Sequence, residues 1–111
     1  MNNNMYTEKK EYYDNGNLWC HSNYKNGLRH GDQKFYYYNG NLWYHFKFKN
    51  GKKHGKQKEY HDNGKLDVEY NMIYGKFYNY YKIYHKVTEK LKYHRLYINN
   101  KEQGFTIKYE N

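Results

Sequence analysis

The sequence predicts an all-β protein, an elongated and twisted antiparallel β-meander of tandem hairpins that form a single-layer sheet. Three observations lead to this prediction. The chain repeats itself at a step of 24 residues, which is typical of arrays built from one supersecondary unit. Asn-Gly pairs recur between runs of alternating side chains, and this is the strongest local signal for a hairpin. The 111 residues include 18 Tyr and no Pro, so strands are favoured throughout.

Two short segments mark the repeat. The first, residues 14–19 (Asp-Asn-Gly-Asn-Leu-Trp), recurs closely at 38–43 and in part at 62–66. The second, residues 25–31 (Lys-Asn-Gly-Leu-Arg-His-Gly), recurs at 49–55. Both segments step by the same interval, so they belong to one repeating unit with two turns.

We expect a flexible N-terminal segment followed by a single repeat domain. The last repeat is degenerate, because Lys90-Leu91 follows Lys65-Leu66 by 25 residues instead of 24. Terminal repeats of such arrays are often atypical because they cap the stack. The expected divisions are the segment 1–5 and a repeat domain 6–111, with repeats over about 6–29, 30–53 and 54–77 and a capping repeat over 78–111.

Each repeat is expected to hold two strands and two turns. A two-residue turn at Asn15-Gly16 would place Tyr12 and Leu18 on opposite faces, whereas a three-residue turn with Gly in a bulge position would place them together. We favour the three-residue turn. The second turn, within 25–31, is expected to be longer, with Gly at both ends. The expected strands cover residues 6–13, 18–25, 32–37, 42–49, 56–61, 66–73, 76–84, 90–97 and 104–109.

Residues that recur at the repeat step orient the strands. A Tyr column and a Leu column recur, and we expect both on the packed face of the sheet. The columns are Tyr12, Tyr36, Tyr60 and Tyr84, and Leu18, Leu42 and Leu66. With them on the packed face we expect Tyr44, Phe46 and Phe48 in the second repeat, and Val68, Tyr70 and Met72 in the third.

The other face is expected to carry a second aromatic group that includes both Trp residues. One interpretation is a contact patch for a partner or a second copy of the chain. The other is cross-strand aromatic pairing within the sheet. The candidate partner-binding residues are Tyr13, Trp19, Phe35, Tyr37 and Trp43.

The net charge of +9 predicts attraction to anionic partners. Four lysines recur at the repeat step, two strands apart, so neighbours in the column lie about 9–10 Å from each other. Such a row beside Tyr rings could follow a phosphate backbone. The other interpretation, which we favour, is a solvated face with Lys stems lying over the rings. The candidate anion-binding residues are Lys10, Lys34, Lys58 and Lys82.

No motif for catalysis or for a cofactor is present in the sequence. Six of the seven His residues fall into three columns whose members lie about 10 Å apart, too far to share a metal ion. His30 and His54 are expected to pack against turns. Cys20 is the only cysteine, which excludes an intrachain disulfide and favours a reducing compartment. No stretch is apolar enough for a signal peptide or a membrane span.

The pattern Tyr-x-x-Asn-Gly-x-Leu, followed by Tyr/Phe-Lys-Asn-Gly-x-x-His-Gly, resembles the MORN-repeat variant. The resemblance is clear over residues 6–75. That variant also occurs in bacterial antitoxin-like repeat proteins and in large DNA viruses. It implies an antiparallel meander and a scaffolding role through protein binding, dimerisation or lipid association.

We therefore expect a non-catalytic protein-interaction scaffold that binds a protein partner or a second copy of itself. The first alternative is a basic, aromatic sheet that binds nucleic acid with low sequence specificity. The second, weaker alternative is association with an anionic membrane surface. We expect no cofactor, no metal and no small-molecule substrate. The expected location is intracellular, in the cytoplasm, and a nuclear or virion-associated location stays open as an alternative.

Overall fold

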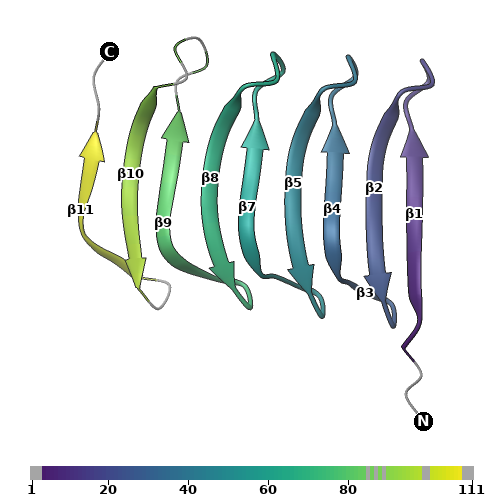
Figure 1. Ribbon diagram of the computed structural model, residues 1–111, viewed down its shortest axis with the longest axis horizontal. Helices are drawn as coiled ribbons and strands as arrows, with labels where there is room; N and C mark the ends of the chain where they lie inside the picture. The colour runs from purple at the N-terminus through teal and green to yellow at the C-terminus, as the bar shows by residue number, and fades with distance from the viewer. Residues whose placement is uncertain (1–3, 85, 87, 89, 99–100, 109–111) are drawn as a thin grey trace.

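The computed structural model describes residues 4–84, 86, 88, 90–98 and 101–108. They form one antiparallel sheet, with β1 (Tyr6–Tyr12) at one edge and β11 (Lys101–Lys108) at the other (Figure 1). The molecule measures 50 × 39 × 13 Å, so its thinnest dimension is a single sheet with its side chains. The predicted all-β, single-layer antiparallel meander is confirmed.

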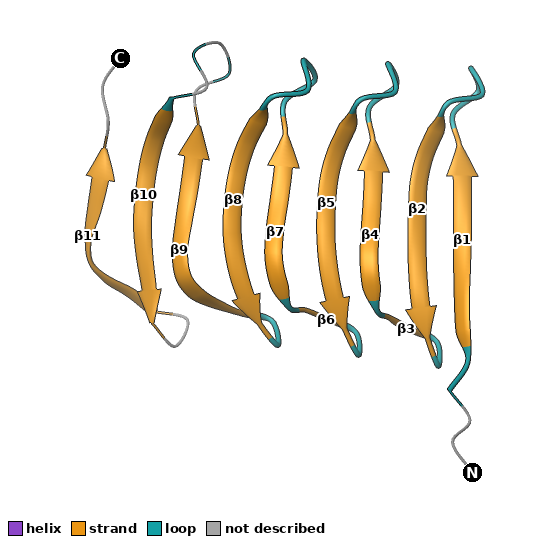
Figure 2. Cartoon of the chain, in the orientation of Figure 1, coloured by secondary structure: helices purple, strands orange, loops and turns teal. Residues whose placement is uncertain are grey.

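Apart from two short strands, strands that follow one another in the sequence lie side by side in the sheet (Figure 2). The remaining strands are β2 (Leu18–Lys25), β3 (Leu28–Arg29), β4 (Gly31–Tyr36), β5 (Leu42–Lys49), β6 (Lys52–Lys53), β7 (Gly55–Tyr60), β8 (Leu66–Ile73), β9 (Lys76–Tyr84) and β10 (Leu91–Ile98). The main path leaves out two short strands, because β3 pairs with β2 and β6 pairs with β5.

The strand predictions agree closely with the structure. Each expected strand is present, and the largest difference is in the last one, which begins at Lys101. The short strands β3 and β6 were not predicted. Residues 1–3 of the expected flexible segment and residue 109 of the last expected strand lie outside the described residues.

The first turn of each repeat is a three-residue loop, as predicted. The Tyr13 N–H donates to the Asn17 carbonyl at 2.8 Å, and the Gly16 N–H donates to the Tyr13 carbonyl at 3.0 Å. Gly16 has φ +88°, a left-handed conformation that Gly adopts without steric cost. The side chain of Asn15 accepts the Asn17 N–H at 2.9 Å and holds the loop.

A β-bulge follows this turn and changes which face the rest of the strand presents. In the β4–β5 register Tyr36 lies opposite Leu42, while Phe35 lies opposite Tyr44. Trp43 is therefore an extra residue. One extra residue shifts the two-residue alternation of side chains, so later residues exchange faces. β2 and β8 carry the same irregularity at the same position of their repeats.

The bulge makes the predicted division of faces wrong. Residues directly opposite each other on antiparallel strands share a face, so Phe35 and Tyr44 lie together and not on opposite sides. Trp43 stacks on Tyr44 with ring centroids 4.6 Å apart, which places it on this face too. Leu42 lies opposite Tyr36 on the other face. The Tyr and Leu columns do share a face, as predicted, but it is not the packed one.

We name the two faces by their chemistry. The aromatic face carries Tyr13, Trp19, Phe35, Tyr37, Trp43, Tyr44, Phe46, Phe48, Val68, Tyr70 and Met72. The basic face carries Lys10, Lys34, Lys58 and Lys82 together with the Tyr and Leu columns. The buried cluster of Val68, Tyr70 and Met72 lies on the aromatic face, so that face is the packed one.

The second turn is tighter than expected. Asn26 and Gly27 both have positive φ, 51° and 80°, and Lys25 pairs with Leu28 across them. These features define a two-residue type I′ turn. The Gly at the far end of the expected long turn, Gly31, has φ +84° and belongs to a separate bulge between β3 and β4.

A glutamine side chain fills the space that this second bulge opens. The Gln33 Nε2 donates to the Asn23 carbonyl at 2.7 Å, and its Oε1 accepts the Asn23 N–H at 3.1 Å. Gln57 binds the backbone of Lys47 in the same way, with both distances 2.8 Å. Both Gln side chains are completely buried. Each amide therefore replaces the strand-to-strand bonds that the bulge removes.

Replacing Gln57 by Leu tests this role. Leu is of similar size but cannot bind the backbone, so the part-buried Lys47 N–H would lose its acceptor. We expect the free energy of unfolding to fall by about 1–3 kcal/mol, measured by urea denaturation. As a control, Lys58→Leu on the same strand but on the basic face should change it by less than about 0.5 kcal/mol. An equal loss in both variants would contradict the role of the amide.

Candidate functional site

The five predicted partner-binding residues come together on the aromatic face. The rings of Tyr37 and Trp43 stack at 4.9 Å, and Trp19 meets Phe35 edge-on at 6.3 Å. Tyr13 lies at the same end of the sheet, in the turn of the first repeat. The stack continues from Trp43 through Tyr44 to Phe46, with centroid distances of 4.6 and 5.0 Å.

Most of this aromatic group packs against itself. The Tyr13 hydroxyl donates to the Tyr36 carbonyl at 2.6 Å, and the Tyr37 hydroxyl donates to the Tyr60 carbonyl. Of the five candidates, Trp19 is the most exposed, at 38%, and the other four are half-buried. The contacts support the interpretation as cross-strand pairing, and a role in partner binding stays a prediction.

The basic face aligns lysines and histidines in one row. Each member lies directly opposite the next on the neighbouring strand, at a spacing of about 4.8 Å. We call this the basic row: Lys10, His21, Lys34, His45, Lys58, Glu69, Lys82 and His94. The alignment of the four lysines was predicted, whereas their merging with the histidines was not. Anion binding by these lysines stays a prediction.

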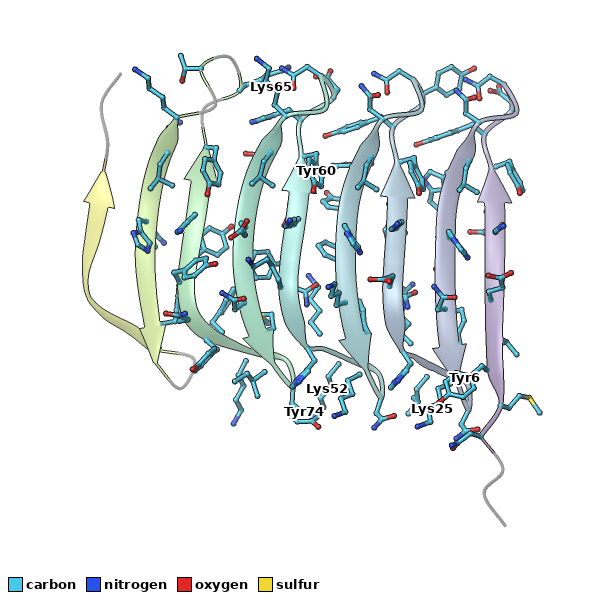
Figure 3. The ribbon with its side chains drawn as sticks, viewed as in Figure 1. Tyr6, Lys25, Lys52, Tyr60, Lys65 and Tyr74 are labelled. Carbon is cyan, nitrogen blue, oxygen red and sulfur yellow. The ribbon has the colours of Figure 1, made fainter. Side chains whose placement is uncertain are left out.

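A stripe of Tyr and Leu side chains borders the basic row. Each Tyr stands two positions after a lysine of the row, so it projects from the same face. We call this the Tyr–Leu stripe: Tyr12, Leu18, Tyr36, Leu42, Tyr60 and Leu66. Tyr12 is 61% exposed, and the others are half-buried. Figure 3 shows Tyr60 on β7, near the end of the sheet that holds the three-residue turns.

Carboxylates lie on the other side of the basic row. The His21 Nε2 lies 2.9 Å from Glu8 Oε2, and the His45 Nε2 lies 2.8 Å from Asp32 Oδ1. The hydrogen bond from the imidazole lowers the pKa of Glu8 and of Asp32. Both carboxylates are therefore ionised at neutral pH, and each one engages a histidine and not a lysine of the row.

Two other histidines brace the tight turns. The His30 Nδ1 accepts the Asn50 N–H at 3.2 Å, and the His54 Nδ1 accepts the Tyr74 N–H at 3.2 Å. Each bond joins one repeat to the next. The interpretation of these histidines as turn-packing residues is confirmed. Within the described ranges, no group of three or more His, Cys, Asp or Glu side chains could hold a metal ion.

Charged side chains also lie among the rings of the aromatic face. The Arg29 guanidinium lies 5.9 Å from the ring centroid of Phe35 and 5.7 Å from that of Phe48. The Lys53 Nζ lies 3.8 Å from the centroid of Phe46. Burial lowers the pKa of Lys53. These cations pack over ring faces, a favourable arrangement for a partly desolvated charge.

Glu59 lies on the same face, opposite Tyr44 and Val68, and burial raises its pKa. The ionised form is therefore less favourable in the folded chain than in the unfolded chain. The free energy of unfolding therefore has its full contribution from Glu59 below the ordinary glutamate pKa of 4.5. This contribution is lost as the pH rises through the raised pKa of Glu59 in the folded chain.

We expect Glu59→Gln to raise the free energy of unfolding at neutral pH, and we expect this gain to vanish below pH 4.5. Urea denaturation across a pH series measures both effects. The matched control is Glu11→Gln at the same repeat position, because its side chain is 40% exposed and already pairs with Lys9 at 3.2 Å. A gain that does not depend on pH would contradict the explanation by burial of the charge.

The described residues include no helix that could cross a membrane. No curated protein and no solved structure matches the chain. The family model of the MORN repeat variant matches residues 6–26, 29–50 and 53–74, which is more than half of the chain. MORN repeats are in general non-catalytic modules for interaction with proteins or membranes. The chain belongs to the MORN repeat variant family.

Proposed function

We propose that this chain is a non-catalytic scaffold that binds an extended acidic segment of a partner protein on its basic face. The observation that carries the proposal is the basic row beside the Tyr–Leu stripe. One row supplies positive charge and the other supplies apolar surface. Both rows repeat at the same step, so a partner with the same spacing meets equivalent sites along the sheet.

The lysines of the row are available to a partner. Lys10, Lys34 and Lys58 form no ion pair with another residue among those described. Lys10 is exposed and the other two are half-exposed. A net charge of +9 adds a long-range attraction for acidic partners. Binding should therefore be fast and should weaken as salt increases.

The spacing of the row indicates the form of the partner. Lysines of successive repeats lie two strands apart, about 9–10 Å. A polyproline II segment rises about 3.1 Å per residue and has three residues per turn, so every third side chain points the same way about 9.3 Å apart. We therefore propose a partner segment with an acidic residue at every third position and apolar residues next to them.

Single-stranded nucleic acid is the second candidate. The exposed Tyr12 ring stands beside Lys10 on the basic face, a combination that can stack a base and bind a phosphate. Two features favour the protein partner. The Leu positions of the stripe offer no ring for a base, and Arg29 and Arg95 are the only arginines, whereas Arg is the better reader of phosphate geometry.

A charge-reversal pair tests the proposal. Lys34→Glu with Lys58→Glu should weaken binding of a synthetic peptide with Glu at every third position by about tenfold or more, because two favourable contacts become repulsive. Titration calorimetry at low salt measures the dissociation constant. The control is Lys52→Glu with Lys65→Glu, which has the same net charge but lies at the two ends of the strands (Figure 3). This control should change binding much less.

Two further ligands, a scrambled peptide and an oligonucleotide, distinguish the proposed spacing from simple charge attraction. A peptide of the same composition in scrambled order should bind the unmodified chain more weakly, because its charges no longer match the repeat step. Equal binding of both peptides would show that net charge alone drives the interaction, and would contradict the proposed match between the acidic residues and the lysine spacing. Binding of a single-stranded oligonucleotide without binding of either peptide would replace the protein partner by the nucleic-acid candidate.

A further inference from the structure

Strand β1 has a neighbour on one side only among the described strands (Figure 1). Its odd-numbered residues bond toward β2, since the Met5 carbonyl accepts the Asn26 N–H and the Tyr13 N–H donates to Asn17. Backbone groups of alternate residues point to opposite sides of a strand within the sheet. The residues whose backbone N–H and C=O groups point to the open edge are Tyr6, Glu8, Lys10 and Tyr12.

The sequence of this edge is complementary to itself when it is reversed. It reads Tyr-Thr-Glu-Lys-Lys-Glu-Tyr over Tyr6–Tyr12. Positions at equal distances from Lys9 are Tyr6 and Tyr12, and then Glu8 and Lys10. We propose that two copies of this chain join edge to edge through β1, antiparallel to each other, with a two-fold axis between the two Lys9 residues. This proposal concerns the edge of the sheet and not the basic face, so it goes beyond the proposed function.

In this register, each of the four residues whose backbone points to the open edge lies opposite a residue of opposite charge or opposite another Tyr. On the basic face Glu8 lies opposite Lys10 of the second copy, and Tyr6 lies opposite Tyr12 of the second copy. Directly opposed Glu–Lys and aromatic pairs stabilise antiparallel strands. The symmetry makes each of these pairs occur twice. Tyr6 and Tyr12 are 65% and 61% exposed in the single chain, so pairing would cover apolar surface that now faces water.

The aromatic face tolerates the same register. The two Lys9 residues meet at the axis, but each Lys9 Nζ is already 3.2 Å from Glu11 of its own chain. Neighbouring registers are worse. A shift of one pair in one direction places Glu8 opposite Glu8, and in the other it places Lys10 opposite Lys10. Both shifts also remove the two Tyr6–Tyr12 pairs and the two Glu8–Lys10 pairs, so the basic face loses its favourable contacts. A two-fold axis normal to the sheet allows only shifts that keep residues on their own face.

Pairing of the edges also removes a hazard. An exposed edge strand pairs readily with other chains unless it is blocked. β1 contains no Pro, and the extra residue of the bulge beside Glu11 and Tyr12 lies on β2. A closed two-fold pairing uses the edge once and stops. The pairing would also join the two sheets into one continuous sheet that carries both basic rows. The two rows would be displaced by two residues where they meet, and a long partner could bind both rows.

Matched charge reversals test the pairing. Sedimentation equilibrium of the full chain over a wide range of concentration measures the dimer. Lys10→Glu should raise the dissociation constant roughly tenfold, because two attractive pairs become repulsive. Lys34→Glu, at the same repeat position inside the sheet, makes the same change in net charge and should leave the dimer intact.

The opposite reversal has its own control. Glu8→Lys should also weaken the dimer, whereas Asp32→Lys should not, although both variants lose a hydrogen bond to a histidine of the basic row. The double variant Glu8→Lys with Lys10→Glu exchanges the charges and should restore the affinity of the unmodified chain. A monomer mass at all concentrations, an equal effect of edge and interior variants, or no restoration in the double variant would each overturn the proposal.

A disulfide test reports the register directly. Cα atoms of a non-hydrogen-bonded antiparallel pair lie about 4.5 Å apart, within the range that a disulfide spans. Lys9→Cys should therefore form a cross-linked dimer on mild oxidation. Thr7→Cys on the same face should not, because it lies opposite Glu11 of the second copy. Cys20 is buried and provides the background level. Cross-linking of both variants to the same extent would contradict the register.

These outcomes are separate from those of the proposed function. Lys34→Glu with Lys58→Glu should impair peptide binding and leave the dimer unchanged. Glu8→Lys should impair the dimer and leave the lysines of the basic row in place for a peptide. Loss of one property without the other therefore identifies which proposal has failed.

Discussion

The structure depends on one constraint, which is that a single sheet has no second layer to cover it. A two-layer protein buries aliphatic side chains between its layers, but here each side chain must be covered by its neighbours on the same face. Large rings meet this need, because one ring shields the next along a stack such as Tyr37, Trp43, Tyr44 and Phe46. The abundance of Tyr follows from the same constraint, since its hydroxyl can reach water or a backbone carbonyl at the edge of a thin structure.

The same constraint makes contacts between successive repeats essential. Asn15 donates to the Tyr38 carbonyl and Asn39 donates to the Asp62 carbonyl, so the three-residue turns are linked in series. At the other end of the strands, the Gly51 N–H donates to the Arg29 carbonyl, and histidines bind the next tight turn. Each repeat is therefore completed by the repeat beside it. Stability in such an array is approximately a sum of nearest-neighbour terms, and among the described strands β1 has a neighbour on one side only.

The two bulges in each repeat give the faces their different chemistry. The bulge at Trp43 brings Trp43 and Tyr44 to the same face as Phe35, and so concentrates aromatic rings on one side. The lysines and histidines then fall together on the other side. At the bulge beside Gly31, the Gln33 amide accepts the Asn23 N–H and donates to the Asn23 carbonyl, which also accepts the His30 N–H. An aromatic face that supports itself leaves the basic face free for a partner, and this asymmetry underlies the proposed function.

The sequence by itself determined the fold class, the strand positions, the three-residue turn at Gly16 and the alignment of Lys10 with Lys34 and Lys58, because these depend on local turn chemistry and on the repeat step. The buried Gln33 and Gln57 recur at that step and could have been found in the same way. The tertiary structure alone decided the faces and joined the histidines to the lysine row. A bulge depends on how two strands pair, and one extra residue moves every later side chain of the strand to the other face. No local pattern at Trp43 could therefore show that its ring lies on the same face as that of Tyr44.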